Sequence, residues 1–363
     1  MTKNRFIISG GGTGGHIYPA LSIANEIDQS FDSPVIKFIG AKGKMEMSIV
    51  PKNGYKIHGL LISGLQRSFS LKNFLLPFKL LISFIQSFYI ILNFKPNFVI
   101  GTGGFASFPI VFIASVLKIP ILIQEQNSFP GISNRLLSNH ADYISVAFDG
   151  MEKFFPEKKI YKTGNPIRES IKSQKKYLNQ RKKLNIKKDT ILISVLGGSL
   201  GSDKINKTIK DNLDFINSKN IFIIWQCGKT YIKEYINYNS ENIFVTDFID
   251  EIESIYYSSD IIIARSGALT LSELAIVSKP SILIPSPNVA ENHQLKNAKK
   301  IEEKNACICI EEKDLDIIFK SKLDLMIKDK NLRDTLSQNI SLMAFPNASH
   351  NIVQLIKKHL INE

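Results

Sequence analysis

Cysteine and tryptophan are scarce in this sequence. Its 363 residues include one tryptophan and three cysteines, which are Cys227, Cys307 and Cys309. Three cysteines cannot form a disulfide framework, and their spacing lacks the paired pattern of a zinc site. We therefore expect buried free thiols in a protein of a reducing compartment. Residues 1–9 contain no apolar run followed by small residues, so we expect no secretory signal.

Acidic residues are absent from one long stretch of the chain. Between Met47 and Gln124 there is no Asp or Glu, whereas seven basic side chains occur there among many apolar ones. The whole chain has a formal net charge of +13, which favours anionic partners. A basic and apolar surface is typical of contact with anionic lipid, and arginine is too scarce here for a nucleic-acid groove. We therefore expect residues 47–124 to contact an anionic membrane surface through Lys72, Leu76, Lys79, Leu80 and Phe84. We expect no binding of nucleic acid.

The most apolar part of this stretch, residues 71–94, has the pattern of a helix. Only 15 uncharged residues separate Lys79 from Lys95, which is too few for a comfortable membrane span. One apolar row at helical spacing is sufficient to pack the helix on a sheet: Phe74, Phe78, Leu81, Ile85, Phe88 and Leu92. A second apolar row lies on another face: Leu76, Leu80, Phe84 and Ile91. The helix is therefore either buried on two sides or packed on one side and in contact with a membrane on the other.

Length and pattern predict two α/β domains. A chain of 363 residues exceeds the usual size of one domain, and short β-rich runs alternate with helical patterns, as in parallel sheets. We expect strands at 5–9, 35–39, 98–101, 120–123, 142–146, 190–195, 221–226, 242–245, 260–264 and 281–284. We expect helices at 15–29, 71–94, 107–117, 201–217, 267–277, 291–303 and 347–360. The break at 163–166 and the charged run 168–188 form the expected linker.

Glycine-rich turns follow several predicted strands. Gly10–Gly15 and Gly197–Gly201 each follow the first strand of one half, and Gly101–Gly104 follows another strand of the first half. The likeness of the halves predicts two doubly wound domains, which bind ligands at the carboxyl ends of their strands. Backbone N–H groups and the helix dipole at Thr13–Gly15 favour an anion such as phosphate. A tight turn alone explains one or two glycines, but not five in six residues.

Two further absences restrict the chemistry. A nicotinamide enzyme needs an acidic residue at the end of its second strand, and residues 38–42 contain none. The one Asp-x-Asp sequence, Asp314 and Asp316, lies in a charge-rich helical region, so we expect no metal and no metal-dependent glycosyl transfer. A leaving diphosphate would then be stabilised by helix N-termini and by Arg168.

Two segments offer candidate catalytic and binding groups. His16 begins the helix after the first glycine turn, and an imidazole there suits the removal of a proton from a sugar hydroxyl. The alternative is a purely structural histidine. Arg265–Glu273 follows a strand and opens a helix, whose first N–H groups can bind a diphosphate while Glu273 accepts the hydroxyls of a ribose. The alternative is that Glu273 only stabilises the helix N-terminus.

Seven motifs together resemble the MurG family, the UDP-N-acetylglucosamine–N-acetylmuramyl-(pentapeptide) pyrophosphoryl-undecaprenol N-acetylglucosamine transferases. The resemblance covers essentially the whole chain. The motifs are Gly-Gly-Thr-Gly-Gly-His (11–16), Gly-Thr-Gly-Gly-Phe (101–105), Gln-Glu-Gln-Asn (124–127), Gly-Asn-Pro-Ile-Arg (164–168), Gly-Gly-Ser-Leu-Gly (197–201), Arg-Ser-Gly-Ala-Leu-Thr-Leu-Ser-Glu (265–273) and Asn-His-Gln (292–294).

The resemblance implies a GT-B fold, with two Rossmann-like domains that face each other across a cleft. Residues 1–163 would bind the acceptor and the membrane, with the last helix (346–363) packed back on them, and residues 164–345 would bind UDP-N-acetylglucosamine. The implied reaction is inverting transfer of N-acetylglucosamine to the 4-hydroxyl of the muramyl sugar of lipid I, giving lipid II and UDP, without a cofactor. The implied location is the cytoplasmic face of the bacterial plasma (inner) membrane, as a peripheral protein beside other cell-wall synthesis proteins.

The resemblance also assigns site residues. It places the donor against Thr13, Gly14, Gly15, Asn127, Arg168, Ser199, Ile249, Ala268, Leu269, Thr270, Leu271, Ser272, Glu273 and Gln294. It places the acceptor diphosphate against Gly14, Gly103 and Gly104. His16 is the stronger candidate base and Glu125 is the alternative. Gln124 and Phe105 stand where many members have His and Tyr, so polar help from those two positions is missing.

Three other functions remain open at this point. A related GT-B enzyme, such as a diacylglycerol glycosyltransferase or a UDP-sugar 2-epimerase, would share the donor loops. A nicotinamide oxidoreductase is disfavoured by the missing acidic residue. A basic nucleic-acid-binding module is disfavoured because the positive region is apolar and poor in arginine.

Overall fold

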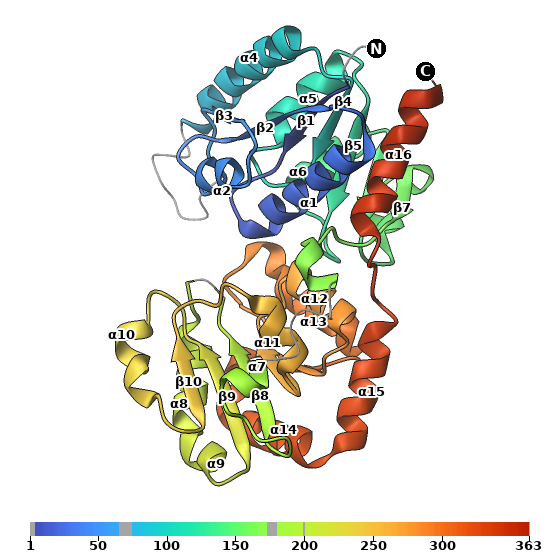
Figure 1. Ribbon diagram of the computed structural model, residues 1–363. Coiled ribbons are helices and arrows are strands. Elements are labelled where there is room, and N and C mark those ends of the chain that lie inside the picture. Colours follow the sequence, from blue (N-terminus) through green and yellow to red (C-terminus); the bar gives the residue numbers. More distant parts are fainter. Residues whose placement is uncertain (1–3, 65–74, 173–179, 199, 363) are drawn as a thin grey trace. The chain divides into compact units, whose positions relative to one another are not determined.

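The computed structural model describes residues 4–64, 75–172, 180–198 and 200–362 (Figure 1). Contacts divide the chain into two compact units. The first unit contains Met1–Arg168 and Asn347–Glu363, and the second contains Glu169–Pro346. The sequence predicts the domain boundary after residue 163, whereas the contacts place it after Arg168.

The first unit is built on a seven-stranded parallel sheet. Its strands are β1 (Arg5–Ser9), β2 (Val35–Ala41), β3 (Ile57–Leu60), β4 (Phe98–Gly101), β5 (Ile121–Glu125), β6 (Tyr143–Val146) and β7 (Ile160–Lys162). Their order in the sheet is β3-β2-β1-β4-β5-β6-β7. Ile7 and Ile8 of β1 pack into different core clusters, because successive side chains of a strand point to opposite faces. Both faces of this sheet are therefore buried.

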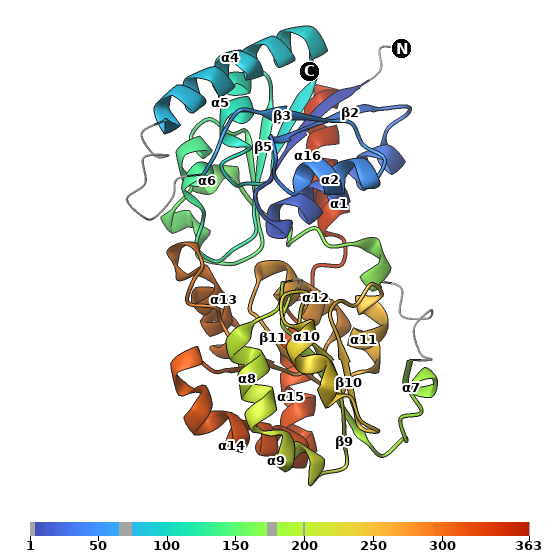
Figure 2. The ribbon, with the colours of Figure 1, turned by 90° about the vertical axis from the view of Figure 1, so that its left-hand side faces the viewer.

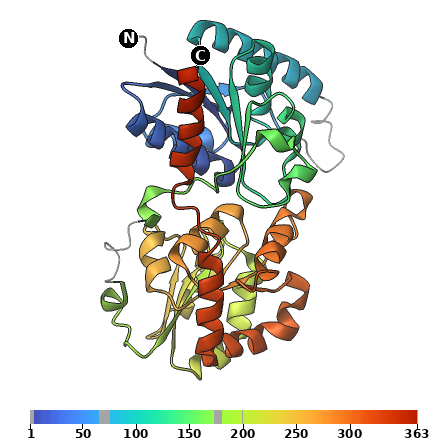
Figure 3. The same cartoon turned by 90° about the vertical axis from the view of Figure 1, so that its right-hand side faces the viewer.

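Helices cover both faces of the first sheet. They are α1 (Gly14–Ser30), α2 (Glu46–Lys52), α4 (Leu76–Phe94), α5 (Phe108–Val116), α6 (Ile132–Leu137) and α16 (Ala348–Asn362), with the 3-10 helices η1 (Met151–Lys153) and η2 (Glu157–Lys159). α1, α2 and α16 share one core cluster with Ile8, and α4, α5 and α6 share the other with Ile7. The chain returns to this unit through α16, which lies along its side and buries Ile352, Val353 and Ile356 completely (Figure 3).

The second unit repeats the architecture on a six-stranded parallel sheet. Its strands are β8 (Ile191–Leu196), β9 (Ile221–Gln226), β10 (Ile243–Thr246), β11 (Ile261–Ala264), β12 (Ser281–Leu283) and β13 (Ile308–Cys309). Its helices are α7 (Gln180–Lys183), α8 (Asp203–Asp211), α9 (Leu213–Asn217), α10 (Ile232–Tyr235), α11 (Ile252–Ser258), α12 (Ala268–Val277), α13 (His293–Glu302), α14 (Leu315–Lys328), α15 (Lys330–Ser341), η3 (Glu169–Lys172), η5 (Ile236–Tyr238), η6 (Ala290–Asn292) and η7 (Glu312–Asp314). The strand order is β10-β9-β8-β11-β12-β13.

Both sheets have the strand order of a Rossmann fold. The direction of winding reverses between β1 and β4 in the first unit, and between β8 and β11 in the second. Such folds bind ligands beyond the carboxyl ends of the two strands at this reversal. The glycine turns predicted from sequence follow β1, β4 and β8, and the segment Arg265–Gly267 follows β11. Two of these four motifs therefore lie at the ligand-binding point of each sheet.

Most of the expected elements are confirmed, with some corrections. The sequence missed β3, β7 and β13, which have four, three and two residues and lie at the edges of their sheets. Such short edge strands contain too few residues to show a pattern. The sequence also missed α2, α6, α11, α14 and α15. The single helix expected over 201–217 is wrong, because the chain leaves the helical conformation at Asn212, between α8 and α9.

The expected linker at 163–166 is part of the first unit. Thr163 and Asn165 are almost completely buried. The Asn165 amide group accepts a hydrogen bond from Gln124 Nε2 at 2.9 Å and donates one to the carbonyl of Gln126 at 3.1 Å. A loop with buried, bonded polar groups is a structural element, and proline and glycine alone did not distinguish it from a linker.

The sequence assigned the two apolar faces of α4 the wrong way round. Leu80 and Phe84, expected at a membrane, pack inward, and the Phe84 ring lies tilted against Phe108 and Phe112 of α5, at 6.1 and 5.3 Å between ring centres. Ser83 and Ser87 are fully buried on the same side, and small residues of this kind allow close helix packing. The row expected to pack on the sheet is exposed instead, with Phe78, Leu81, Ile85, Phe88 and Leu92 between 39% and 62% accessible.

Length and composition alone would allow α4 to cross a membrane. Its mean hydropathy is 1.5 over an 18-residue window of which 17% is buried, and it is the one such helix in the described part of the chain. In the structure α4 lies along the outside of the first unit, beside α5 (Figures 1 and 2). Lys72 and the expected start of this helix lie outside the described residues.

Candidate functional site

Two glycine turns pack tightly together at the ends of β1 and β4. A Cβ atom on Gly10 would lie 1.9 Å from the Thr102 hydroxyl, and one on Gly104 would lie 2.3 Å from the carbonyl oxygen of Gly11. Gly12, Gly103 and Gly104 also have positive φ angles, which favour glycine. Packing and backbone conformation therefore account for these glycines.

Gly14 and Gly15 have no such explanation. A Cβ atom on Gly15 would lie 3.5 Å from Thr13 Oγ1, which is an ordinary contact, and one on Gly14 would lie 3.2 Å from the Tyr18 ring. Both residues open α1, whose N-cap Thr13 makes no side-chain hydrogen bond to the helix. The first N–H groups of a helix have no partner within it. The anion that the sequence predicts at Gly14 and Gly15 would therefore meet a helix start without a side-chain cap.

His16 is held by this packing. Its Nδ1 lies 3.0 Å from the carbonyl oxygen of Thr102 and 3.0 Å from Gln126 Oε1. Both are acceptors, because the Gln126 amide nitrogen donates to the same Thr102 carbonyl at 2.7 Å. Nδ1 therefore carries the proton in the neutral ring, and Nε2 has a lone pair that can accept one. The ring is half-buried, so Nε2 can act on a bound group.

Glu125, the alternative base, is occupied by hydrogen bonds. Its side chain is 2% accessible. Oε1 accepts from the backbone and side-chain nitrogens of Asn127 at 2.9 and 3.1 Å, and Oε2 accepts from the Gly131 backbone and from Asn134 Nδ2 at 3.1 and 2.9 Å. Both carboxylate oxygens therefore already accept hydrogen bonds from the protein. Glu125 thus fixes the loop that carries Asn127.

The sequence did not reveal Glu46 as part of this site. Its carboxylate is completely buried and accepts hydrogen bonds from the backbone of Gly12 at 3.0 Å and of Ala41 at 2.9 Å. A Cβ atom on Gly11 would lie 2.2 Å from Glu46 Oε1. The glutamate therefore ties the first glycine turn to the end of β2. A single acidic residue in an irregular stretch gives no signal of this role.

In the second unit, α12, which follows β11, begins without a side-chain cap. Its N-cap is Gly267, which has no side chain to bind the first N–H groups. The helix that follows the other glycine turn, α8, is capped by its own Ser202, whose hydroxyl accepts from Ile205 N at 3.3 Å. Ala268, Leu269 and Thr270 thus present N–H groups to an anion. Ser199, expected beside them, lies outside the described residues.

Glu273 lies one turn into α12 and is 8% accessible. Its Oε2 accepts a hydrogen bond from the Tyr256 hydroxyl at 2.9 Å, which orients the carboxylate. Leu271 is less suited to binding, because its N–H donates to the Gly267 carbonyl at 3.0 Å and its side chain is buried. The hydroxyl of Ser272 donates to the Ala268 carbonyl at 3.0 Å.

Gln294 is brought to the start of α12 by two hydrogen bonds. Its backbone oxygen accepts from the Ser266 hydroxyl at 2.8 Å, and its Oε1 accepts from Ser286 N at 2.9 Å. Its amide nitrogen can therefore donate to a sugar hydroxyl. Ile249 lies beyond β10, where its N–H donates to Gln226 Oε1 at 3.2 Å.

Arg168 and Arg265 have different surroundings. Arg168 ends the first of the two segments that form the first unit, and its guanidinium lies 5.1 Å from the centre of the Tyr18 ring. Arg265 forms an ion pair with Glu312 and donates to the hydroxyl of Ser202 and, at 3.0 Å, to the carbonyl of Ile284. Arg265 thus holds the ends of β11 and β12 and the start of α8 together.

Metal-binding clusters and reactive thiols are not found in the described part of the chain. No group of three His, Cys, Asp or Glu there could hold a metal ion. All three cysteines are free, and Cys227 and Cys307 are buried, as expected, whereas Cys309 is half-buried. Burial raises the pKa of Cys227 to about 11 and that of Cys309 to about 11, so both remain protonated near neutral pH.

Comparison with known proteins identifies the family. Residues 6–146 match the model of the glycosyltransferase family 28 N-terminal domain, and residues 192–352 match that of its C-terminal domain. A UDP-N-acetylglucosamine–N-acetylmuramyl-(pentapeptide) pyrophosphoryl-undecaprenol N-acetylglucosamine transferase of Flavobacterium psychrophilum is 50% identical over 362 residues, covering 99% of this chain and 98% of that one. The chain belongs to the MurG family, within glycosyltransferase family 28. The resemblance inferred from the seven motifs is confirmed.

Further MurG-family members and solved structures agree. The Bacteroides thetaiotaomicron transferase of the same name is 43% identical, covering 98% of this chain and 97% of that one. The crystal structure of Acinetobacter baumannii MurG has a TM-score of 0.79 at 23% identity and covers 98% of this chain and 100% of that one. A putative UDP-N-acetylglucosamine 2-epimerase of Listeria monocytogenes has a TM-score of 0.71 at 13% identity, covering 100% and 98%. These likenesses confirm the predicted GT-B fold.

We expect Gly15→Ala to separate stability from function in this MurG-family chain. The added methyl group meets only an ordinary contact, and alanine favours a helix over glycine by up to about 1 kcal/mol, so the free energy of unfolding should not fall. The methyl group should obstruct an anion at the open N-terminus and lower the rate of sugar transfer. Urea unfolding and a transfer assay measure the two effects.

The matched control is Gly11→Ala, whose methyl group would meet the Glu46 carboxylate and should cost about 1–3 kcal/mol of stability. A Gly15→Ala protein with undiminished transfer would show that no ligand approaches this backbone.

Proposed function

We propose that the chain transfers N-acetylglucosamine from UDP-N-acetylglucosamine to the 4-hydroxyl of the muramyl sugar of lipid I, with inversion, to give lipid II and UDP. Membership of the MurG family supports this activity. The observation that carries the proposal is an open helix N-terminus at the ligand-binding point of each unit, at α1 in the first and at α12 in the second. Two such sites suit two substrates that each contain a diphosphate.

We assign the nucleotide sugar to the second unit. The N–H groups of Ala268, Leu269 and Thr270 would bind its diphosphate, and Glu273, oriented by Tyr256, would accept the ribose hydroxyls. Gln294 would donate its amide hydrogen to the sugar, and Ile249 and Ser272 would line the site. When the bond from the anomeric carbon to UDP breaks, negative charge grows on the diphosphate, and the α12 dipole stabilises it.

We assign the acceptor to the first unit. Gly14, Gly103 and Gly104 would bind its pyrophosphate, and Thr13, Gly15, Asn127 and Arg168 would reach the donor sugar. His16 Nε2 would remove the proton from the attacking hydroxyl as the new bond to the anomeric carbon forms. Glu125 would act as a positioning residue for Asn127, because its four hydrogen bonds leave it poorly placed to take a proton.

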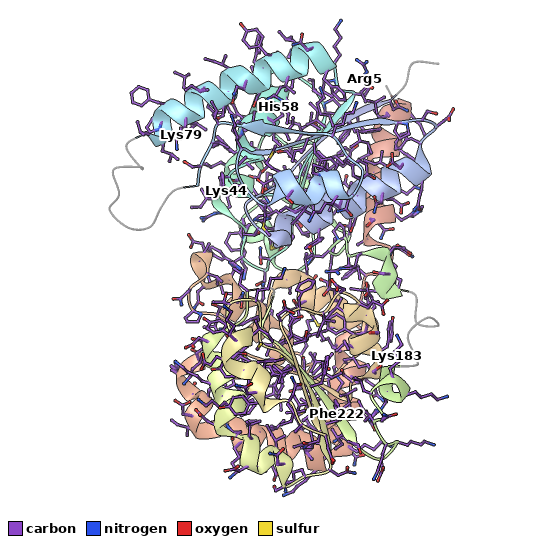
Figure 4. All side chains as sticks on the ribbon, turned by 60° about the vertical axis from the view of Figure 1, so that its left-hand side comes forward. Arg5, Lys44, His58, Lys79, Lys183 and Phe222 are labelled. Atoms are coloured by element: carbon purple, nitrogen blue, oxygen red, sulfur yellow. The ribbon has the colours of Figure 1, made fainter. Side chains whose placement is uncertain are left out.

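We also propose that the exposed face of α4 rests on an anionic membrane, as in a peripheral protein. A helix that is apolar all round and packed on one side only leaves a contiguous apolar surface, which marks an interaction site. Side chains of α4 project outward from the unit, and Lys79 lies near its N-terminal end (Figure 4). Basic residues beside an apolar face favour anionic lipid.

The direct test of the activity is transfer of radiolabelled sugar from UDP-N-acetylglucosamine to a soluble lipid I analogue, in the presence of a chelator. We expect a labelled disaccharide product and stoichiometric UDP. Conversion of the nucleotide sugar to its epimer without transfer would contradict the proposal and favour the alternative activity of the structurally similar epimerases.

In the same assay, His16→Ala should lower kcat by about 10²–10⁴-fold, because a general base contributes that much, and should leave the KM for the nucleotide sugar nearly unchanged. His58→Ala is the matched control. His58 is exposed on the edge strand β3 (Figure 4), which β2 separates from β1 and its glycine turn. Equal losses in kcat and in donor affinity would make His16 a positioning residue.

Membrane contact is tested by sedimentation with vesicles that contain phosphatidylglycerol. The double variant Leu81→Ser/Ile85→Ser should bind at least about tenfold more weakly, because two exposed aliphatic side chains no longer enter the lipid. Added salt should weaken the binding of the wild type. Ile317→Ser, at a residue 79% accessible in the second unit, should bind as the wild type does. Unchanged binding of the α4 variant would remove this helix from the membrane surface.

A further inference from the structure

We propose that the outer face of α6 supports the polyprenyl chain of the acceptor where this chain leaves the catalytic loops. The proposal rests on the proposed function, since it concerns the acceptor of that reaction. The face is formed by Ile132 and Leu136, which are one helical turn apart and 55% and 59% accessible. It is distinct from the face of α4 that we assign to the membrane.

The inner side of α6 is anchored at the proposed site. Asn134 Nδ2 donates to Glu125 Oε2 at 2.9 Å and to the Gln124 carbonyl at 3.1 Å, and Leu137 is fully buried. The neighbouring Gln126 is the residue that contacts the His16 ring. These bonds hold α6 in place and direct Ile132 and Leu136 outward. The two exposed aliphatic side chains therefore lie on a rigid element next to the catalytic loops.

The surroundings of this face are apolar and basic. Arg135, between Ile132 and Leu136, places its guanidinium 5.5 Å from the centre of the Phe129 ring. From Met47 to Ala141 the sequence contains one acidic residue, the buried Glu125. An apolar surface with a positive rim suits a molecule that joins a pyrophosphate to a hydrocarbon chain.

α6 lies in the same layer of helices as α4. α5 packs against both α4 and α6, and the three helices follow one another over the same side of the first unit (Figures 1 and 2). Val116, at the end of α5, is 61% accessible, and the ring of Phe112 lies 5.7 Å from that of His140, which follows α6. The helix α5 thus joins the membrane-facing helix α4 to α6.

The chemistry of the acceptor indicates which molecule covers this face of α6. The relatives' printed name places undecaprenol directly on the pyrophosphoryl group. If the glycine turns bind that pyrophosphate, the first isoprene units begin beside these turns, at a distance from the membrane. Hydrocarbon in water is unfavourable, so a chain that leaves this point follows an apolar surface where one is present. The face of α6 is such a surface.

The test compares two acceptors with the double variant Ile132→Ser/Leu136→Ser. One acceptor carries the undecaprenyl chain and is dissolved in detergent micelles. The other is a water-soluble analogue whose pyrophosphate carries a methyl group in place of the chain. We expect the KM for the undecaprenyl acceptor to rise at least about tenfold, as for the loss of two aliphatic contacts. The KM for the soluble analogue and for UDP-N-acetylglucosamine should stay within twofold (roughly) of the wild type. Ile317→Ser is the control for an exposed aliphatic residue elsewhere.

Three results would overturn the inference. The first is that the KM of the α6 variant for both acceptors is the same as that of the wild type. The second is that phosphatidylglycerol vesicles without acceptor bind the α6 variant as weakly as the α4 variant, which would make α6 part of the membrane surface. Alternatively, analytical ultracentrifugation finds a wild-type dimer that the variant loses, which would make this face an interface between two copies. Absence of transfer by the wild type to either acceptor would instead contradict the proposed function.

Discussion

The close approach of two glycine turns in the first unit is the constraint on which the proposed chemistry depends. Only residues without side chains allow the backbone of Gly104 to approach Gly11 and that of Gly10 to approach Thr102. Thr102 can then bind both ends of His16, because its hydroxyl donates to the His16 carbonyl at 2.8 Å and its own carbonyl accepts from Nδ1. Backbone packing thus selects the tautomer of the imidazole and leaves the lone pair on Nε2.

The second unit uses the same constraint with a different result. A Cβ atom on Gly228 would lie 2.1 Å from Gly201 Cα, so the turn after β8 closes on the turn after β9. Yet α8, which follows, is capped by Ser202, whereas α12, after β11, has no side-chain cap. The two Rossmann-like units therefore present an open helix N-terminus after different strands. The N-cap residue makes the difference, since it is Ser202 in α8 and Gly267 in α12. This asymmetry suits two substrates of different shape.

Much of the fold could be predicted from the sequence, and the failures have physical causes. Buried central strands such as β1 and β9 are continuous apolar runs and were found, whereas β13 has two residues and no pattern. Both faces of α4 are apolar, so periodicity could not decide which one packs. The buried Ser83 and Ser87 mark the inner face, but serine alone does not signal burial. Motifs placed His16 and Glu273 after strands, but they did not show which residues contact them. Thr102 lies in the motif 101–105, which gives no sign of its contact with His16, and Tyr256 lies in no motif.

The buried Glu46 sets an electrostatic condition on any anion in the first unit. A carboxylate beneath the glycine turn repels a phosphate above it, so its presence needs a compensating effect. Its two hydrogen bonds consume the N–H groups of Gly12 and Ala41, which would otherwise attract an anion to the middle of the turn. Gly14 and Gly15 also have N–H groups, which lie at the start of α1 and adjacent in sequence to His16. The glutamate therefore makes two N–H groups at the ends of β1 and β2 unavailable to a ligand, whereas the start of α1 is not bonded to it.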